Sequence, residues 1–412
     1  MLSGARAQRA LAQRLRGARV VVVGHAAGEP RTLLRLLAEV APPGLRVVCG
    51  FAFAGSPLPE LAAREDLRID CWHPTPVTRP LLEQGRVGLL PMRSGQAEAV
   101  FAALRPDALL TVVAPARGGR NSFGASAGHA AAAARQARLV IAEVNPAMPT
   151  TAGDPGLSTG EGVLLVESEE GLASYSGARA DATSAAVARN VLPLCFDGAR
   201  LQLGIGSVPE ALGALVAAGD GPRRVTFYGM GMDYMAEADR RGVTDPDACL
   251  LASPELVSPG IWELADGNPR ILVEGAERSY NPARLAALGT LVSVNSALLI
   301  DLSGQVASEG IGVRPVTGIG GALDFAIAAQ ASGGFSVFAL PSTFGDGSSR
   351  IVSSLPTGTP VSVPSHVPDY VVSEWGVAAL RGLDRDERAT ALAAVAHPDH
   401  REGLQAAEFR GH

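Results

Sequence analysis

A buried amide and a glycine turn stand out among the residues that could stabilise a developing negative charge. The apolar run "VNSALLIDLSGQV" contains Asn295, and a side-chain amide inside such a run must find hydrogen-bond partners. It can hold a neighbouring turn, or it can donate to a developing oxyanion. Further on, "TGIGGALDF" places Gly318, Gly320 and Gly321 directly before a helical pattern. Backbone N–H groups at a helix start suit a carbonyl oxygen or a phosphate.

Two further turns carry side chains or space that a ligand could use. In "VTFYGMGMDYMAEADRRG" (225–242), a strand pattern enters a glycine-bracketed turn that has no Ser, Cys, His or Glu before Glu237. In "FALPSTFGDGSSRIV", Ser342 and Thr343 end a strand pattern, and the chain returns through Ser349 and Arg350. This composition suits contacts to pyrophosphate or ribose phosphate, although a surface loop has a similar composition.

Composition excludes several kinds of chemistry. The 35 basic residues are all arginine, so neither a lysine Schiff base nor a lysine-dependent phosphate loop is possible. The four cysteines lack C-x-x-C spacing, which predicts inert, reduced thiols and a cytoplasmic protein. The seven histidines do not cluster in the sequence, and even His397 and His400 lack an arranged set of ligands, so no metal site is expected.

Neither nucleic acid nor membrane is an expected partner. The net charge of −6 comes without a basic cluster, and no run approaches the length of a membrane-spanning helix. The turn "LGIGS" supplies Gly204 and Gly206 after a strand pattern. However, position 209 is Pro where a dinucleotide fingerprint needs a third glycine, so NAD or FAD binding is not predicted.

Uniformly apolar runs alternate with helical patterns along the chain. Runs such as "ARVVVVGH", "DALLTVV" and "ARLVIAEVN" are typical of strands in a parallel sheet that helices cover on both faces. The pattern restarts near residues 175–190. The sequence therefore predicts an α/β protein with two open parallel-sheet domains, over residues 1–187 and 188–412.

Several of these segments together resemble the acetyl-CoA hydrolase/transferase family, a group of family I CoA-transferases. The resemblance rests on "QLGIGSVPEAL", "VNSALLIDLSGQV", "TGIGGALDFA", "ALPST…SRIV", "YVVSEWGVAALRG" and "AHPDHREGL", with "GHAAGEPRTLL", "NSFGAS" and "ARLVIAEVNPAMPTTAGD" in the first half. It implies two α/β domains of the CoA-transferase fold that bind acyl-CoA, and usually a homodimer or larger homo-oligomer. It also implies oxyanion stabilisation by Asn295 and the amides of Gly320 and Gly321. The residues on the CoA side would be Gly318, Ser342, Thr343, Ser349 and Arg350, and those on the substrate side Gly204, Gly206, Ser122, Gly229 and Met230.

One position departs from the family at the point where its chemistry occurs. In the family a glutamate attacks the thioester and then carries CoA, within a motif of an aromatic or His, a small polar residue, Glu, Met, two variable residues and Asp. The corresponding segment here reads Phe227, Tyr228, Gly229, Met230, Gly231, Met232, Asp233. The Met, the Asp and Gly242 fit, but Gly229 occupies the place of the glutamate. Ala322 is a second departure, because the family usually has Gln there.

Three hypotheses follow for the function. An acceptor could attack a bound acyl thioester directly, with Tyr228 or Asp233 as proton acceptor, and hydrolysis by water is a variant of this reaction. A relocated carboxylate, for example Glu237, Glu274 or Glu277, could support an ordinary CoA-transferase or acetyl-CoA hydrolase. The protein could also bind acyl-CoA without turnover. We expect a CoA-bound or carrier-bound acyl thioester and a small-molecule acceptor as partners, with CoA thioester as substrate and no permanently bound cofactor.

Overall fold

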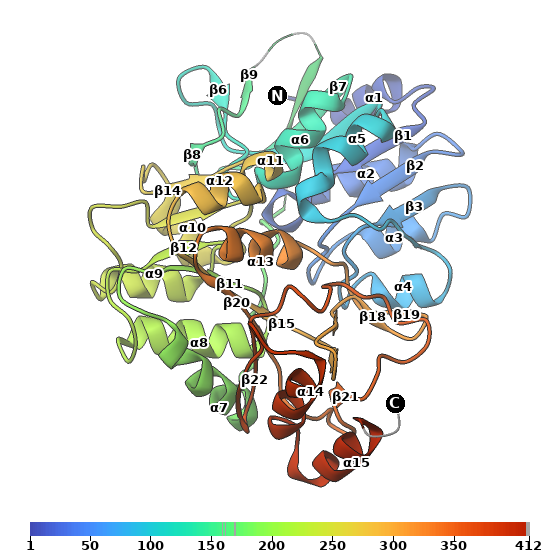
Figure 1. Ribbon diagram of the computed structural model, residues 1–412. Coiled ribbons are helices and arrows are strands. Elements are labelled where there is room, and N and C mark those ends of the chain that lie inside the picture. The colour runs from blue at the N-terminus through green and yellow to red at the C-terminus, as the bar shows by residue number, and fades with distance from the viewer. Residues whose placement is uncertain (159, 161, 169, 409–412) are drawn as a thin grey trace. The chain divides into compact units, whose positions relative to one another are not determined.

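The run of four valines that forms β1 (Val20–Val23) lies near the middle of a seven-stranded parallel sheet. A computed structural model describes residues 1–158, 160, 162–168 and 170–408, so residues 409–412, the end of the predicted second domain, lie outside the described residues (Figure 1). The chain forms two compact units. The first contains Met1–Ser176, Met230–Asp233 and Leu251–Tyr280, and the second contains Gly177–Gly229, Tyr234–Leu250 and Asn281–His412.

The sheet of the first unit has the strand order β10-β7-β5-β1-β2-β3-β4, and every neighbouring pair is parallel. Its other strands are β2 (Arg46–Cys49), β3 (Arg68–Cys71), β4 (Gly88–Leu89), β5 (Ala108–Val113), β7 (Leu139–Val144) and β10 (Val163–Glu167). Most side chains of β1, β2 and β5 are buried on both faces, which explains why these strands are apolar apart from Arg46 and Thr111. The predicted parallel sheet is confirmed in this unit.

Helices and short strands complete the first unit. Its helices are α1 (Gly4–Arg14), η1 (Ala26–Gly28), α2 (Arg31–Val40), α3 (Leu58–Ala62), α4 (Arg79–Glu83), η2 (Ser94–Gln96), α5 (Ala97–Leu104), α6 (Gly128–Gln136), α10 (Pro259–Ala265) and α11 (Ala276–Ser279). Helices α5 and α6 pack side by side (Figure 1). The remaining strands are β6 (Arg120–Asn121), β8 (Ala152–Gly153), β9 (Leu157–Ser158), β13 (Leu251–Ser253) and β14 (Ile271–Val273). Strand β14 pairs in parallel with both β13 and β8.

The second unit has a mostly parallel sheet with the order β23-β22-β20-β15-β11-β12, and only β22 and β23 are antiparallel. These strands are β11 (Arg200–Leu203), β12 (Thr226–Tyr228), β15 (Leu291–Ser296), β20 (Phe335–Ala339), β22 (Tyr370–Ser373) and β23 (Gly376–Ala379). Smaller strands are β16 (Leu299–Asp301), β17 (Val306–Ala307), β18 (Gly310–Ile311), β19 (Arg314–Pro315) and β21 (Ile351–Val352). The α/β fold predicted for the second half is therefore also confirmed.

Some helices of the second unit begin at a side-chain cap. They are α7 (Ala182–Val191), η3 (Leu192–Leu194), α8 (Ser207–Ala218), α9 (Asp233–Arg240), α12 (Pro282–Ala287), α13 (Ala322–Ala331), α14 (Arg385–Ala394) and α15 (Pro398–Glu408). The Asp181 side chain accepts the Ser184 N–H ahead of α7, and Asp384 and Glu387 form a capping box at α14.

The boundary between the units differs from the predicted one at 187/188. That boundary falls inside α7, which belongs to the second unit, and the chain later returns to the first unit through 230–233 and 251–280. This return depends on the long-range pairing of β14 with β8, which no local sequence pattern reveals.

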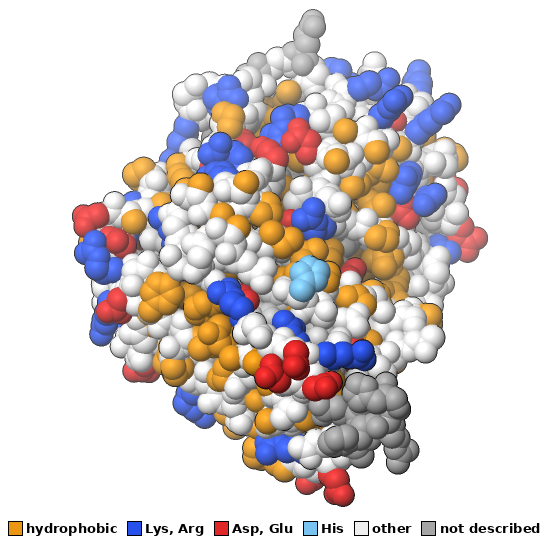
Figure 2. All heavy atoms as spheres, in the orientation of Figure 1, with side chains coloured by type: hydrophobic (Ala, Val, Ile, Leu, Met, Phe, Trp, Pro, Cys, Tyr) orange, Lys and Arg blue, Asp and Glu red, His pale blue; other side chains and the backbone are white. Residues whose placement is uncertain are grey.

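Arginine and acidic side chains are interspersed on the face drawn in Figure 2, and no large basic patch forms on that face. No helix among the described residues is long and apolar enough to cross a membrane.

Candidate active-site turn and polar network

The turn after β12 has a backbone shape that suits glycine. Gly229 has a φ of 91°, in the left-handed region that residues with a Cβ rarely adopt. A Cβ built there would lie 3.3 Å from the Gln202 Cγ, so the turn lies directly against that side chain. Gly231 is equally constrained, because its Cβ would come within 2.4 Å of Leu256. Met230, between these glycines, is half-buried.

Gln202, Ser293 and Asn295 form a buried polar network at the ends of β11 and β15. The Asn295 Nδ2 donates to Gln202 Oε1 at 3.1 Å and to Ser293 Oγ at 2.9 Å. In return, Gln202 Nε2 donates to Asn295 Oδ1 at 3.2 Å. Both N–H groups of Asn295 are thus used inside the protein, which is the structural role considered for this amide. Its role as an oxyanion donor stays a prediction, and would require the network to open.

The predicted residues Gly204, Gly229 and Asn295 lie together around Gln202. A Cβ at Gly204 would contact the Asn295 Oδ1 at 3.3 Å, and Gly229 contacts Gln202 as described above. The three residues meet because β11 pairs in parallel with both β12 and β15, so their carboxyl ends share one edge of the sheet.

The two predicted proton acceptors have structural partners. The Tyr228 hydroxyl accepts a hydrogen bond from Arg200 Nη1 at 2.7 Å, and burial raises the pKa of Tyr228, which keeps its phenol protonated at neutral pH. The Asp233 Oδ1 accepts the Ile261 N–H at 2.9 Å and the Ser258 hydroxyl at 2.7 Å. Asp233 therefore caps α10, a neighbour in the first unit, rather than its own helix.

The glycine turns at the helix starts are formed as the sequence predicts. Gly320 has a φ of 60°, Gly321 is the N-cap of α13, and Gly318 lies three residues before that cap. The first backbone N–H groups of α13 have no partners within their own helix. Gly206 is the N-cap of α8, with its N–H 3.4 Å from Glu210 Oε1.

The segment predicted to contact CoA is a tight loop with many internal hydrogen bonds. Ser342 is fully buried, and its hydroxyl donates to Glu374 Oε1 at 2.6 Å. Thr343 and Ser349 form an isolated antiparallel β-bridge, and the Ser349 hydroxyl donates to the Ile351 carbonyl. Arg350 lies 4.2 Å over the Phe344 ring, and burial lowers the pKa of its guanidinium. Glu374, which orients Ser342, was not identified from the sequence.

In the first unit, Ser122 holds its own loop. Its hydroxyl accepts the Gly124 N–H at 2.9 Å and lies 3.4 Å from the Thr151 hydroxyl. Its predicted contact with substrate remains a prediction.

The three glutamates considered as relocated nucleophiles all form ion pairs. Glu237 pairs with Arg240 and Arg241 on the surface of α9. Glu274 pairs with Arg278 at 3.0 Å, and Glu277 pairs with Arg135 at 2.7 Å. A nucleophilic role for any of them would require these ion pairs to break.

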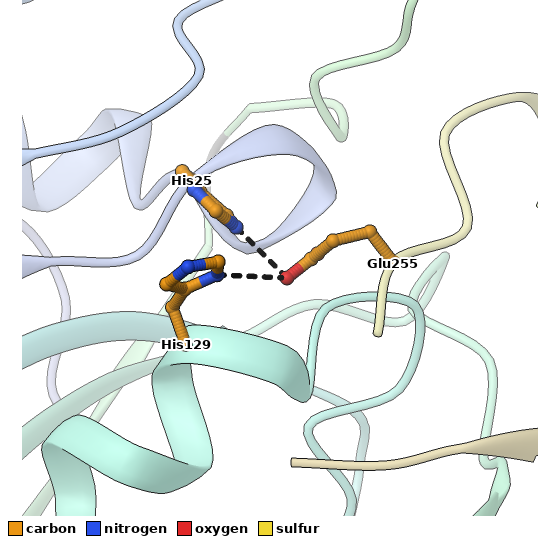
Figure 3. Close-up of side chains that lie close together, drawn as sticks. All are labelled: His25, His129 and Glu255. Atoms are coloured by element: carbon orange, nitrogen blue, oxygen red, sulfur yellow. Dashed lines mark hydrogen bonds and ion pairs between the residues drawn. The ribbon is translucent and has the colours of Figure 1, made fainter. Parts of the chain in front are cut away.

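A second group of titratable residues was missed, because two histidines that are far apart in the sequence lie together in the structure. His25 and His129 have ring centroids 4.6 Å apart, and His25 Nε2 lies 2.8 Å from Glu255 Oε1 (Figure 3). Burial lowers the pKa of His25 to about 3 and of His129 to about 4, and it raises the pKa of Glu255. In the sequence, each of these three residues is a polar residue in a segment of mostly small or apolar residues. Such segments are too common to indicate a site.

Comparison with known proteins identifies the family and the fold of the chain. The model of the "Acetyl-CoA hydrolase/transferase C-terminal domain" family matches residues 258–408. A 4-hydroxybutyrate coenzyme A transferase of Clostridium kluyveri is 32% identical over 397 residues, which cover 93% of this chain and 92% of that relative.

Two solved structures have the same fold over nearly the whole chain. RipA from Yersinia pestis superposes with a TM-score of 0.86 at 26% identity, covering 98% of this chain and 99% of that one. A 4-hydroxybutyrate CoA-transferase from Porphyromonas gingivalis gives a TM-score of 0.77 at 27% identity, covering 99% and 97%. The protein thus belongs to the acetyl-CoA hydrolase/transferase family and has the α/β fold of its CoA-transferase relatives.

Proposed function

We propose that this protein is an acyl-CoA-processing enzyme that transfers an acyl group from CoA directly to an acceptor, without a glutamyl-enzyme intermediate. The observation that carries the proposal is Gly229, which has no side chain and lies beside Gln202 at the shared edge of β11, β12 and β15. The Clostridium kluyveri relative and the Porphyromonas gingivalis structure are both CoA-transferases, which supports an acyl thioester as the substrate.

The reaction balances without a covalent enzyme intermediate. An amine or hydroxyl of the acceptor, or water, attacks the thioester carbonyl, a bond from its nitrogen or oxygen to that carbon forms, and the carbon–sulfur bond breaks. The proton of the nucleophile passes to the departing CoA thiolate, so the products are the acylated acceptor and CoA thiol. Holding both reactants in one site can supply much of the rate.

The amides of Gly320 and Gly321 are the first candidates to stabilise the oxyanion, since they lie in the turn that begins α13. Asn295 would support them by ordering the strand ends through Gln202 and Ser293. Asp233 is the better candidate of the two for relaying the proton from the nucleophile to the CoA thiolate, because Tyr228 is held as a protonated phenol.

The remaining assignments follow the family resemblance. The loop with Ser342, Thr343, Ser349 and Arg350 would contact CoA, and Ser122 and Met230 would contact the acyl or acceptor group. We further propose a cytoplasmic homodimer, with a CoA-bound or carrier-bound thioester as donor.

An exchange assay tests the mechanism. Purified protein is incubated with propionyl-CoA and labelled acetate, and labelled acetyl-CoA and free thiol are followed by mass spectrometry. We expect thiol release without labelled acetyl-CoA, and an increase in release when amine or alcohol acceptors are supplied. If the wild-type protein forms labelled acetyl-CoA, a carboxylate nucleophile is present and the proposed mechanism is wrong. If neither labelled acetyl-CoA nor free thiol forms, but the CoA thioester binds in a titration, the result would instead support the non-catalytic alternative.

A substitution at the turn provides the matched experiment. Gly229→Glu supplies a carboxylate at the vacant position, and we expect it to gain exchange of label, whereas Gly229→Gln should not. Both variants have the same backbone strain at a φ of 91°, which costs about 1–2 kcal/mol. A gain of exchange in both variants would show that the added carboxylate is not the cause.

A further inference from the structure

Three buried polar side chains meet in the first unit outside the turn described above. His25 follows β1 at the start of η1, His129 lies in the first turn of α6, and Glu255 follows β13 (Figure 3). One nitrogen of each histidine and one carboxylate oxygen all lie within 4.8 Å of one another. His25 Nε2 is 2.8 Å from Glu255 Oε1, and His129 Nδ1 is 3.9 Å from the same oxygen. Residues far apart in the sequence thus direct possible ligand atoms toward one point.

This cluster is buried, and only some of its polar atoms have hydrogen-bond partners. The side chains of His25, His129 and Glu255 are exposed by 2%, 4% and 1%. Both ring nitrogens of His129 and the Oε2 of Glu255 have no hydrogen-bond partner among the described residues. Buried polar atoms without partners are costly, and in native proteins each one needs an explanation, such as an ordered water or a bound ion.

The surroundings leave space for these side chains and keep water out. A Cβ at Gly50 would lie 2.2 Å from His25 Nδ1, and a Cβ at Gly128 would lie 2.9 Å from Glu255 Oε1. Aromatic rings enclose the histidines, since Trp72 stacks on His129 with centroids 5.2 Å apart and Phe51 lies 5.1 Å from His25.

We propose that His25, His129 and Glu255 form a binding site for a divalent transition-metal ion of the Zn²⁺ class. Two imidazole nitrogens with one carboxylate are a donor set that Zn²⁺ accepts, and a bidentate Glu255 would complete four coordination. Zn²⁺ with bonds of about 2.0–2.1 Å in a tetrahedral site separates its ligand atoms by about 3.3 Å. The two nitrogen–oxygen distances of 2.8 and 3.9 Å bracket that value, and no two of the three atoms are more than 4.8 Å apart, so each side chain needs to shift by no more than about 1–2 Å.

One contact limits the affinity of this site. The Phe51 N–H points to His25 Nδ1 at 3.4 Å, so in the metal-free protein His25 carries its proton on Nε2 and donates it to Glu255. Coordination through Nε2 moves that proton to Nδ1 and breaks the contact with Phe51. The two buried N–H donors then face each other without an acceptor, and the metal–ligand bonds must exceed this cost. The ion would then tie together the segments after β1 and β13 and the start of α6, which is a structural role in the first unit.

Metal analysis of the full-length protein tests the proposal. The protein, without a histidine tag, is stripped with a chelator, loaded with Zn²⁺ or Co²⁺ and dialysed, and its metal content and thermal transition are measured. We expect about one ion per chain, a rise in the transition temperature that a chelator reverses, and visible bands of tetrahedral Co²⁺. No retained ion, or an octahedral Co²⁺ spectrum, would overturn the proposal, and this result requires no variant.

Variants identify the ligands. Glu255→Gln and His129→Gln keep side-chain size and should each weaken binding by at least about 10–100-fold. The control is His397→Gln/His400→Gln, which removes the partly exposed histidine pair beside Asp399 and should retain the ion. Full retention by both cluster variants, or loss in the control, would show that the ion binds elsewhere.

Discussion

Replacing Gln202 by leucine tests whether the buried network holds the strand ends of the second unit. Gln202 is 3% exposed and makes three side-chain hydrogen bonds. It accepts from the Ser293 hydroxyl at 2.5 Å and from Asn295 Nδ2 at 3.1 Å, and it donates to Asn295 Oδ1 at 3.2 Å. Leucine has nearly the same size but offers none of these contacts.

The expected cost follows from the groups that lose their partners. The Ser293 hydroxyl, one N–H of Asn295 and the Asn295 carbonyl oxygen would remain buried, and each unsatisfied group costs about 1–3 kcal/mol. The apolar surface of leucine offsets part of this loss, so we expect the unfolding free energy of the second unit to fall by about 3 kcal/mol. Gln202→Leu/Asn295→Leu should cost less than the two single changes together, because it removes both sides of the amide pair.

Urea unfolding followed by circular dichroism measures this loss, and hydrogen exchange of peptides from β11 and β15 locates it. The control is Gln13→Leu, at an exposed position of α1, which should stay within about 0.5 kcal/mol of the wild type. A Gln202→Leu protein as stable as the control, with unchanged exchange in β15, would refute the structural role of the network. Asn295 would then be free to act mainly as an oxyanion donor.

Three further changes have defined outcomes. Gly50→Ala puts a methyl group 2.2 Å from the buried His25 ring and should destabilise the protein by about 1–3 kcal/mol in thermal unfolding. The control Gly345→Ala, at a position with open space, should not destabilise it. Equal transition temperatures of the two variants would contradict the tight packing at Gly50. Burial raises the pKa of Glu143 from 4.5 to about 7, so folding favours the protonated carboxyl. Its contribution to the unfolding free energy is complete below pH about 4.5 and falls by about 3 kcal/mol as the pH rises from there through 7. Glu143→Gln should lack this decline. If the difference in unfolding free energy between this variant and the wild type stays constant from pH 5 to 8, Glu143 does not have the raised pKa. Asp233→Ala removes the cap of α10 and should cost about 1 kcal/mol in urea unfolding, a loss that an unchanged midpoint would disprove.

Much of the fold could be predicted because its information is local. β1 consists of four valines, and five of the six buried residues of β5 are apolar, with Thr111 as the exception. Apolar residues on both faces of a strand are typical of a sheet that is covered on both sides. The glycine turns before α8 and α13 were likewise visible, because a tight turn followed by a helical pattern involves neighbouring residues.

The site could be predicted only in part, because its contacts cross between strands. The sequence analysis placed Gly204 and Gly229 in turns after strands and Asn295 inside a strand, but it did not identify Gln202 as the side chain that joins them. The order β15-β11-β12 decides that contact, and strand order follows from how helices cover the sheet and not from any single strand.

The amino-acid sequence by itself determined the alternation of strands and helices, the absence of lysine chemistry and the lack of a carboxylate at position 229. Only the tertiary structure decided that His25 and Glu255, 230 positions apart, share a hydrogen bond beside His129, and that Asp233 caps α10. The physical reason is that side-chain type and local periodicity are properties of neighbouring residues. Which polar groups meet in the interior is decided by the packing of the whole unit, where each buried group must find a partner wherever the fold provides one.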